Sequence, residues 1–219
     1  MRNIKLVIGD KNYSSSSICP WLLLKMFNVD FEEINIKLFQ DNTAEKLGPY
    51  SPSLKVPVLL YGSYTIWDSL SICEFISESL LNGTALPADQ KSRASARSVS
   101  AEAHSDFQTL RREWPMNCAA KVLLSPSEAL QEEIGRIDAI WSNYRQRFGE
   151  GGPYLFGRFS IADSMFAATA ISFESYGAEL SKRAHAYMKT LLRNPFVSQW
   201  KTLGRKEKEF LSIAYAESA

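Results

Sequence analysis

Hydrophobic residues in the first 81 positions alternate between short runs with strand spacing and longer stretches with helical spacing. Glycine, proline and small polar residues separate these runs, as expected of turns between elements. The pattern predicts strands at 4–9 and 31–37, a hairpin of strands at 57–61 and 64–67, and helices at 18–27, 43–47 and 69–81. The resulting order, β-α-β-α-β-β-α, indicates a mixed four-stranded sheet with helices on both faces.

The pattern changes after residue 89, because no later segment shows a strand pattern. The stretch 82–89, Asn-Gly-Thr-Ala-Leu-Pro-Ala-Asp, is rich in turn-forming residues and predicts a linker. Helical spacing then recurs at 90–113, 127–148, 161–177, 181–193 and 196–213. We therefore expect a chain of class α/β plus all-α, with an α/β domain over 1–81 and an all-helical domain over 90–219.

Composition describes a globular protein of 219 residues with 45% hydrophobic residues and a formal net charge of +1. The 25 basic residues are balanced by 24 acidic ones and form no basic block, which argues against nucleic acid as a partner. Apolar runs fall short of the roughly 20 residues that a membrane span needs, and the N-terminus lacks the apolar region of a signal peptide. We expect a cytoplasmic protein without a membrane partner.

Cysteine and histidine are sparse. The three cysteines, Cys19, Cys73 and Cys118, are odd in number and widely spaced, which argues against a disulfide framework and a structural zinc site. The only histidines are His104 and His185, so no metal cofactor is expected.

The stretch from Lys55 to Leu70 carries the clearest binding signal. Pro57 donates no backbone hydrogen bond, so it marks the start of a strand at which Val56 keeps free backbone groups for an extended peptide. Asp68 and the serine after it begin a predicted helix and offer a carboxylate, a hydroxyl and unpaired N–H groups. This combination fits a small peptide that bears both an ammonium and a carboxylate.

These residues resemble the glutathione S-transferase family, and the resemblance extends over nearly the whole chain. It implies a thioredoxin-like N-terminal domain that binds glutathione, followed by a helical domain that supplies the pocket for a second substrate. In the family, the Val-Pro pair is a cis-proline site. Val56-Pro57 would thus bind the cysteinyl backbone of glutathione, and Asp68-Ser69 would bind its γ-glutamyl end. A homodimer is also implied.

Two further groups of motifs support the resemblance. The segment 157–163 resembles the family's capping motif, in which Ser160 and Asp163 satisfy each other's backbone N–H groups and so support the fold. More narrowly, the chain resembles a bacterial subgroup that carries Tyr-Ser-Ser-Trp-Ser and Pro-Met-Asn motifs and is related to the theta- and zeta-like classes. Its matching segments here are Tyr13-Ser14-Ser15, 20–25, His104-Ser105, Leu110-Arg111 and 115–117.

The thiol of glutathione must ionise to attack an electrophile, and a free thiol with a pKa of about 8.5 is mostly protonated at neutral pH. The predicted loop after the first strand offers hydroxyl donors that would stabilise the thiolate. Alignment on the first helix places Ser14 at the serine that theta- and zeta-like relatives use, so Ser14 is the predicted activator. Ser15, Ser16 and Tyr13 are the alternates, and some of these serines can instead simply satisfy backbone groups in a turn.

This loop also departs from the subgroup. Ser16 replaces its Trp and Cys19 replaces an Arg, which removes an aromatic wall and a cation beside the sulfur. Cys19 raises the hypothesis of glutaredoxin-like thiol exchange, because cysteines at helix N-termini ionise easily. Ser16, however, stands where the attacking cysteine of a Cys-x-x-Cys pattern is needed. Cys73 and Cys118 are interpreted as buried fillers.

The remaining candidates complete the predicted site. Lys55 and Gln40 are assigned to the glycyl carboxylate of glutathione, and a solvated lysine is the alternative for the first. Helical spacing and the resemblance predict that the electrophile pocket is lined by His104, Phe107, Leu110 and Arg111. The alternative for His104 is a core histidine, and the alternative for Arg111 is a surface ion pair.

Together these residues predict a glutathione S-transferase-like enzyme that activates the glutathione thiol for attack on a small electrophile. A zeta-like glutathione-dependent cis–trans isomerase is a second hypothesis, with an arginine attracting an anionic substrate. A non-catalytic glutathione-binding or interaction protein is a third.

Overall fold

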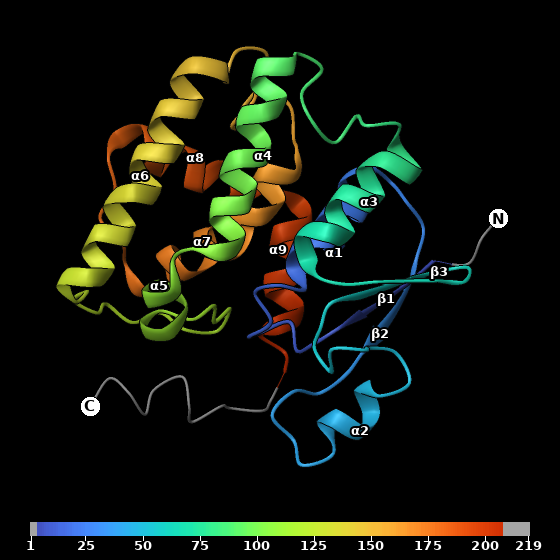
Figure 1. Cartoon of the computed structure of the whole chain (residues 1–219). Helices are drawn as coiled ribbons and strands as arrows, with labels where there is room; N and C mark the ends of the chain where they lie inside the picture. Colours follow the sequence, from blue (N-terminus) through green and yellow to red (C-terminus); the bar gives the residue numbers. More distant parts are fainter. Residues whose placement is uncertain (1–3, 208–219) are drawn as a thin grey trace.

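The computed structural model describes residues 4–207, and its first part is built on one mixed sheet (Figure 1). β1 (Ile4–Ile8) lies between β2 (Glu32–Asn35), which runs parallel to it, and β3 (Val58–Tyr61), which runs antiparallel. β4 (Tyr64–Ile66) pairs with β3, giving the strand order β2-β1-β3-β4. The predicted fold class and element order of this part are confirmed.

Helices cover both faces of the sheet, as predicted. Figure 1 shows α1 (Ile18–Met26) and α3 (Ser69–Leu81) on one side and α2 (Thr43–Leu47) on the other. The alternation of side chains along β1 explains this arrangement, because successive strand residues point to opposite faces. Leu6 belongs to the main buried cluster, whereas Val7 belongs to a smaller cluster that includes a leucine of α2. The strand is therefore apolar at consecutive positions.

The rest of the described chain is helical. Its helices are α4 (Gln90–Ser105), α5 (Gln108–Glu113), α6 (Glu128–Phe148), α7 (Ile161–Tyr176), α8 (Lys182–Arg193) and α9 (Pro195–Gly204). α7 is buried along nearly its whole length and packs against α1, α4 and α8, which is the position expected of a helix that is apolar all round. Across residues 4–207, no helix has the length and apolarity that a membrane span requires.

The structure breaks the predicted helix 90–113 in two. Asp106 is extended, and Phe107 adopts a left-handed conformation with φ of 58°. The break lets Phe107 bury its ring while Arg111 turns back to donate hydrogen bonds to carbonyls at the end of α4. Helical spacing misses the break because both halves keep an apolar face. The last predicted helix, 196–213, is observed only to Gly204, and its residues 208–213 lie outside the described chain.

Asp163 fixes the start of α7. Its buried carboxylate accepts hydrogen bonds from the Ser160 N–H at 2.8 Å, the Leu155 N–H at 3.0 Å and the Tyr187 hydroxyl at 2.8 Å, and it forms a capping box with Ser160. Burial raises the pKa of Asp163, and these donors oppose the shift. The pair supports the central helix and lies apart from the cavity described next.

Candidate functional site

A cavity of about 580 Å³ lies between the sheet and the helical part. Its walls come from the β1–α1 loop, the segment before β3, the start of α3, the α4–α5 region and α7. Most of the predicted site residues line it: Tyr13, Ser15, Ser16, Cys19, Lys55, Val56, Pro57, Asp68, Ser69, His104, Phe107, Leu110 and Arg111. Ser14 and Gln40 do not.

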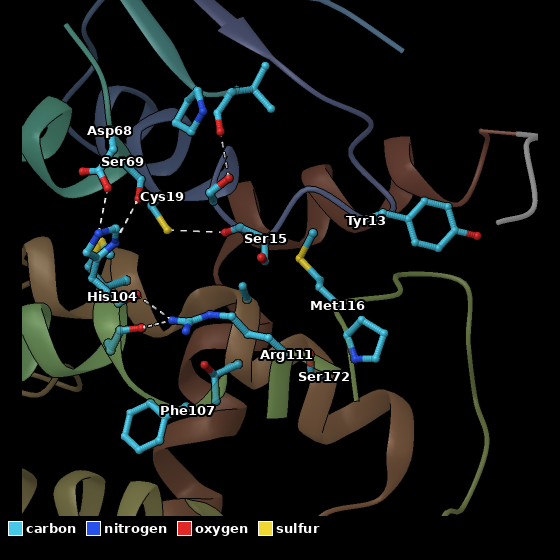
Figure 2. A pocket seen from close by; sticks show the side chains of 18 of the residues that line it. Tyr13, Ser15, Cys19, Asp68, Ser69, His104, Phe107, Arg111, Met116 and Ser172 are labelled. Carbon is cyan, nitrogen blue, oxygen red and sulfur yellow. Dashed lines mark hydrogen bonds and ion pairs between the residues drawn. The ribbon is translucent and has the colours of Figure 1, made fainter. Parts of the chain in front are cut away.

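Asp68 and Ser69 stand at one end of the cavity, where α3 begins (Figure 2). Asp68 is the N-cap, and its Oδ1 accepts hydrogen bonds from the backbone N–H groups of Leu70 at 3.1 Å and Ser71 at 3.3 Å. Its Oδ2 lies 2.7 Å from His104 Nε2, and His104 Nδ1 lies 3.5 Å from the Ser69 hydroxyl. The His104 side chain is 36% exposed, so it is not a core histidine.

Val56 and Pro57 line the cavity at the start of β3. Their peptide bond is cis, which the family resemblance implied. The Ser16 hydroxyl donates to the Val56 carbonyl at 3.2 Å, so Ser16 faces this backbone. Lys55 is exposed beside it, and its backbone N–H and carbonyl both bond to the Ser51 hydroxyl. The segment thus brings the cis-proline backbone and the exposed Lys55 to the same cavity.

The serine loop differs from the prediction for Ser14. Ser14 is 5% exposed, and its hydroxyl donates to the Ser17 hydroxyl at 2.7 Å, which itself accepts the Gly9 N–H. This chain of hydrogen bonds ties the loop to the end of β1 and turns Ser14 away from the cavity. Ser15 and Ser16 line the cavity instead. Among residues 4–207, no hydrogen bond engages the Ser15 hydroxyl.

Tyr13 and Gln40 occupy the margins of the predicted site. The Tyr13 ring extends away from the end that holds Asp68 and His104 (Figure 2). Gln40 lies in the exposed loop after β2, and its side-chain amide donates to the Leu38 carbonyl at 3.5 Å. Gln40 is therefore not among the residues that line the cavity, and its assignment to the glycyl carboxylate stays a prediction.

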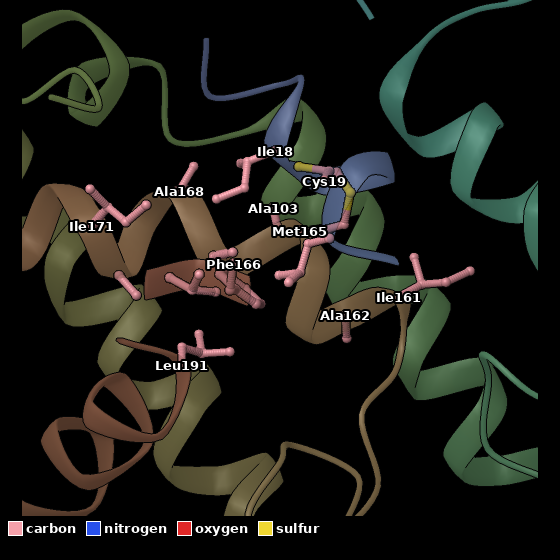
Figure 3. Close-up of a cluster of buried hydrophobic side chains, with 14 of the residues drawn as sticks. Ile18, Cys19, Ala103, Ile161, Ala162, Met165, Phe166, Ala168, Ile171 and Leu191 are labelled. Atoms are coloured by element: carbon pink, nitrogen blue, oxygen red, sulfur yellow. The ribbon is translucent and has the colours of Figure 1, made fainter. Parts of the chain in front are cut away.

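Cys19 lines the cavity and is 3% exposed. Figure 3 shows it among apolar side chains of α1, α4 and α7, including Ile18, Ala103 and Met165. Burial raises the pKa of the Cys19 thiol to about 12, and the Arg111 guanidinium only partly offsets this. Its Sγ donates to the Ser15 carbonyl at 3.5 Å. At neutral pH the thiol is therefore protonated, which does not favour thiol exchange through Cys19.

Arg111 supplies a cation at the helical wall of the cavity. Its guanidinium donates to the carbonyls of Ala103 at 2.6 Å and His104 at 2.9 Å, and also to the carbonyl of Asp106. Burial lowers the pKa of Arg111, yet an arginine stays charged in proteins. The charge stands beside Phe107 and the other apolar residues of this wall.

Sequence reasoning missed the far wall of the cavity. It is formed by Trp114, Pro115 and Met116, which follow α5, and by a stripe of α7 that consists of Met165, Ala168, Thr169 and Ser172. The Pro-Met-Asn motif was a signal for the first group, but nothing in its pattern assigns it to a pocket. Burial of α7 all round leaves no amphipathic pattern that marks its cavity side. Residues 4–207 contain no cluster of three His, Cys, Asp or Glu residues able to hold a metal ion.

Comparison with known sequences points to one family. Residues 13–79 match the model of the glutathione S-transferase N-terminal domain. A probable maleylacetoacetate isomerase of Caenorhabditis elegans is 32% identical over 171 residues, which are 72% of this chain and 78% of that protein. The maleylacetoacetate isomerase of Mus musculus is 30% identical over 181 residues, 75% of this chain and 78% of its own length.

Solved structures share the fold. A glutathione transferase homologue from Burkholderia with bound glutathione superposes with a TM-score of 0.69 at 24% identity and covers 94% of this chain and 100% of its own. A theta class glutathione S-transferase from Xanthomonas axonopodis pv. citri, also with glutathione bound, has a TM-score of 0.66 at 17% identity and covers 91% and 97%. At such identities the likeness speaks for the fold alone.

Proposed function

This chain belongs to the glutathione S-transferase family, and on that premise we propose that its cavity binds glutathione and presents the thiol to a small electrophile. The observation that carries the proposal is the juxtaposition, in one cavity, of the Val56-Pro57 backbone with the Asp68-Ser69 helix start. The cysteinyl backbone would lie along Val56 and the γ-glutamyl group at Asp68-Ser69. The exposed Lys55 ammonium would meet the glycyl carboxylate.

We assign the thiol donor to Ser15. The Ser15 hydroxyl faces the cavity and has no hydrogen-bond partner among the described residues, whereas the Ser14 hydroxyl is bonded to Ser17. A hydroxyl that donates to the sulfur stabilises the thiolate, and each pKa unit is worth about 1.4 kcal/mol. Ser16 has a different role in this proposal: its hydroxyl donates to the Val56 carbonyl and so positions the backbone against which the cysteinyl residue of glutathione would lie.

The test replaces Ser15 with Ala and uses Ser14→Ala as the matched control. We expect Ser15→Ala to lower turnover of a model electrophile by about 10- to 100-fold while glutathione affinity stays within about threefold, because the lost donor acts mainly on the thiolate. Steady-state kinetics give turnover, and calorimetry gives affinity. Ser14→Ala is expected to keep turnover within about threefold. Full turnover in Ser15→Ala would remove it from this role.

A second candidate is glutathione-dependent cis–trans isomerisation of an anionic substrate. Arg111 supports it, since a half-buried guanidinium beside an apolar wall suits a carboxylate. The relatives with the name maleylacetoacetate isomerase point the same way. The two reactions differ in glutathione balance: a transferase consumes glutathione, whereas an isomerase returns it. Measuring free thiol during conversion of maleylacetoacetate and of a model electrophile decides between them.

The third hypothesis is a protein that binds glutathione without turning it over. It predicts saturable binding by calorimetry together with rates at background for both substrates. We further propose a cytoplasmic homodimer, on the strength of the family resemblance. Light scattering on the purified protein tests the dimer, which predicts a mass of twice 24.7 kDa.

A further inference from the structure

We propose that His104 is a positioning residue for the glutamyl end of glutathione, a role that rests on the function proposed above. His104 does not act on the electrophile in this view. Its imidazole holds the Asp68 carboxylate in the orientation that receives the ligand's ammonium. The glutamyl subsite is then built from both halves of the chain, α3 from the first and α4 from the second.

The hydrogen bonds of Asp68 show what His104 adds. As N-cap, Asp68 uses Oδ1 to accept the N–H groups of Leu70 and Ser71. Two donors on one oxygen leave the second oxygen without a backbone partner. His104 Nε2 lies 2.7 Å from that Oδ2, which is the distance of a charge-assisted hydrogen bond. The carboxylate is then held at both oxygens, and Oδ2, with one donor, keeps the capacity to accept a second from a ligand.

The other nitrogen of the same ring faces Ser69. Nδ1 lies 3.5 Å from the Ser69 hydroxyl, so the tautomer with its proton on Nε2 donates to Asp68 and accepts from Ser69. One imidazole therefore orders the carboxylate for the ligand's ammonium and the hydroxyl for the ligand's carboxylate. The ligand class that fits is an amino acid end with both groups free, as in the γ-glutamyl residue.

Arg111, which lines the cavity, holds the backbone at His104 in place. Arg111 donates to the His104 carbonyl at 2.9 Å and to the Ala103 carbonyl at 2.6 Å, which satisfies the C-terminal carbonyls of α4. This contact fixes the last turn of α4 and hence the height at which the imidazole meets Asp68. Asp68 and His104 remain 46% and 36% exposed, so a ligand has access to both.

The experiment compares two substitutions at His104. His104→Gln keeps an N–H donor at the position of Nε2, whereas His104→Phe keeps a planar ring without a donor. His185→Gln, on α8, is the control for loss of a histidine elsewhere. The probes are glutathione and its desamino analogue, in which glutarate replaces glutamate so that the ammonium is missing. Calorimetry gives both affinities, and steady-state kinetics separate KM for glutathione from kcat.

We expect His104→Phe to weaken glutathione about three- to tenfold and to raise KM by the same factor, because a hydrogen bond to a charged group is lost at a half-exposed site. Binding of the desamino analogue should weaken by a smaller factor, because that analogue lacks the ammonium that Asp68 receives and keeps only the carboxylate that Ser69 receives, and kcat should change by less than about twofold. His104→Gln should restore glutathione affinity, and His185→Gln should match the parent. In an Asp68→Asn background, His104→Phe should cost little more, as expected of coupled residues.

Two outcomes overturn the inference while leaving the function proposed above intact. One is parent-like glutathione affinity in His104→Phe, and the other is an equal loss for glutathione and its desamino analogue, which a merely structural contact would produce. Failure of the parent protein to bind glutathione overturns the proposed function and this inference together.

Discussion

At the scale of single residues, the hydroxyls of neighbouring serines in the loop after β1 point in different directions. The Ser14 N–H donates to the Asp10 carbonyl at 2.8 Å, and the Ser17 N–H donates to the Ser14 carbonyl at 3.2 Å. These consecutive turns decide which hydroxyl points inwards and which faces the cavity. A shift of one residue therefore separates a hydroxyl that supports the loop from one that is able to meet a thiol.

The buried thiol of Cys19 allows a direct test at this scale. Its pKa is raised from the ordinary value of 9.0 to about 12, so burial favours folding at every pH below 9.0, and this contribution is lost as pH rises from 9.0 towards 12. We expect iodoacetamide at about pH 8 to leave Cys19 unmodified in the folded protein and to modify it in urea. Peptide mass spectrometry reads the outcome. Rapid labelling of the folded protein would favour the thiol-exchange hypothesis.

At the scale of elements, α9 and the residues after it hold the serine loop in place. The Glu207 carboxylate accepts the N–H groups of Lys11 and Asn12, each at 2.9 Å. The Lys11 ammonium pairs with Glu33, which also accepts the indole N–H of Trp21 at 2.8 Å. The loop is thus held on one side by Glu207, which follows α9, and on the other by Glu33 of β2.

Gly204 tests this anchoring, because it lies against the loop backbone. A Cβ there would stand 3.0 Å from both Asn12 N and Lys11 C, which are backbone atoms that yield little. We expect Gly204→Ala to lower the free energy of unfolding by about 1–3 kcal/mol and to reduce turnover by displacing the loop. Urea unfolding and steady-state kinetics measure the two effects.

Gly135 on α6 provides the matched control for this substitution. Nothing lies within 4 Å of a Cβ placed there, so Gly135→Ala should raise the free energy of unfolding by about 0.5–1 kcal/mol and leave turnover unchanged. Equal behaviour of the two glycine variants would contradict the anchoring role of α9.

At the scale of the whole molecule, one buried cluster joins the sheet to the helices. It runs without interruption from α1 through α7 to α8 and α9, and Figure 3 shows Ile18 and Cys19 of α1 beside residues of α7. Trp21 of α1 and Trp200 of α9 meet edge to face, with ring centroids 5.1 Å apart. The two parts of the chain thus share their apolar interior, and the cavity lies where they meet.

A shared interior predicts that the two parts unfold together. Tryptophan fluorescence reports on both, since Trp21 lies in the first part and Trp141 in the second. We expect its urea transition to coincide with that of far-ultraviolet circular dichroism. Two separate transitions would instead favour independent domains at 1–81 and 90–219.

A bound ligand should stabilise this shared interior as a whole. Glutathione at 100 times its Kd should add about 2.7 kcal/mol to the free energy of unfolding, which urea titrations with and without glutathione measure.

The sequence by itself determined the features that depend on neighbours along the chain. The period of apolar residues, the punctuation by proline and glycine, and the helix start at Asp68 lead to the observed element order of the first part of the chain, because strand alternation and helix capping are local effects. The Val-Pro motif and the Ser160–Asp163 cap belong to the same class.

Only the tertiary structure decided what depends on residues distant in sequence. The direction of Ser14, the burial that keeps Cys19 protonated, the break before α5 and the place of Gln40 all follow from packing between elements. The same holds for His104, which meets Asp68 across 36 positions of sequence. Helical spacing indicates the face on which a side chain lies, but the partner on that face is chosen by the free energy of burial and hydrogen bonding in the folded chain.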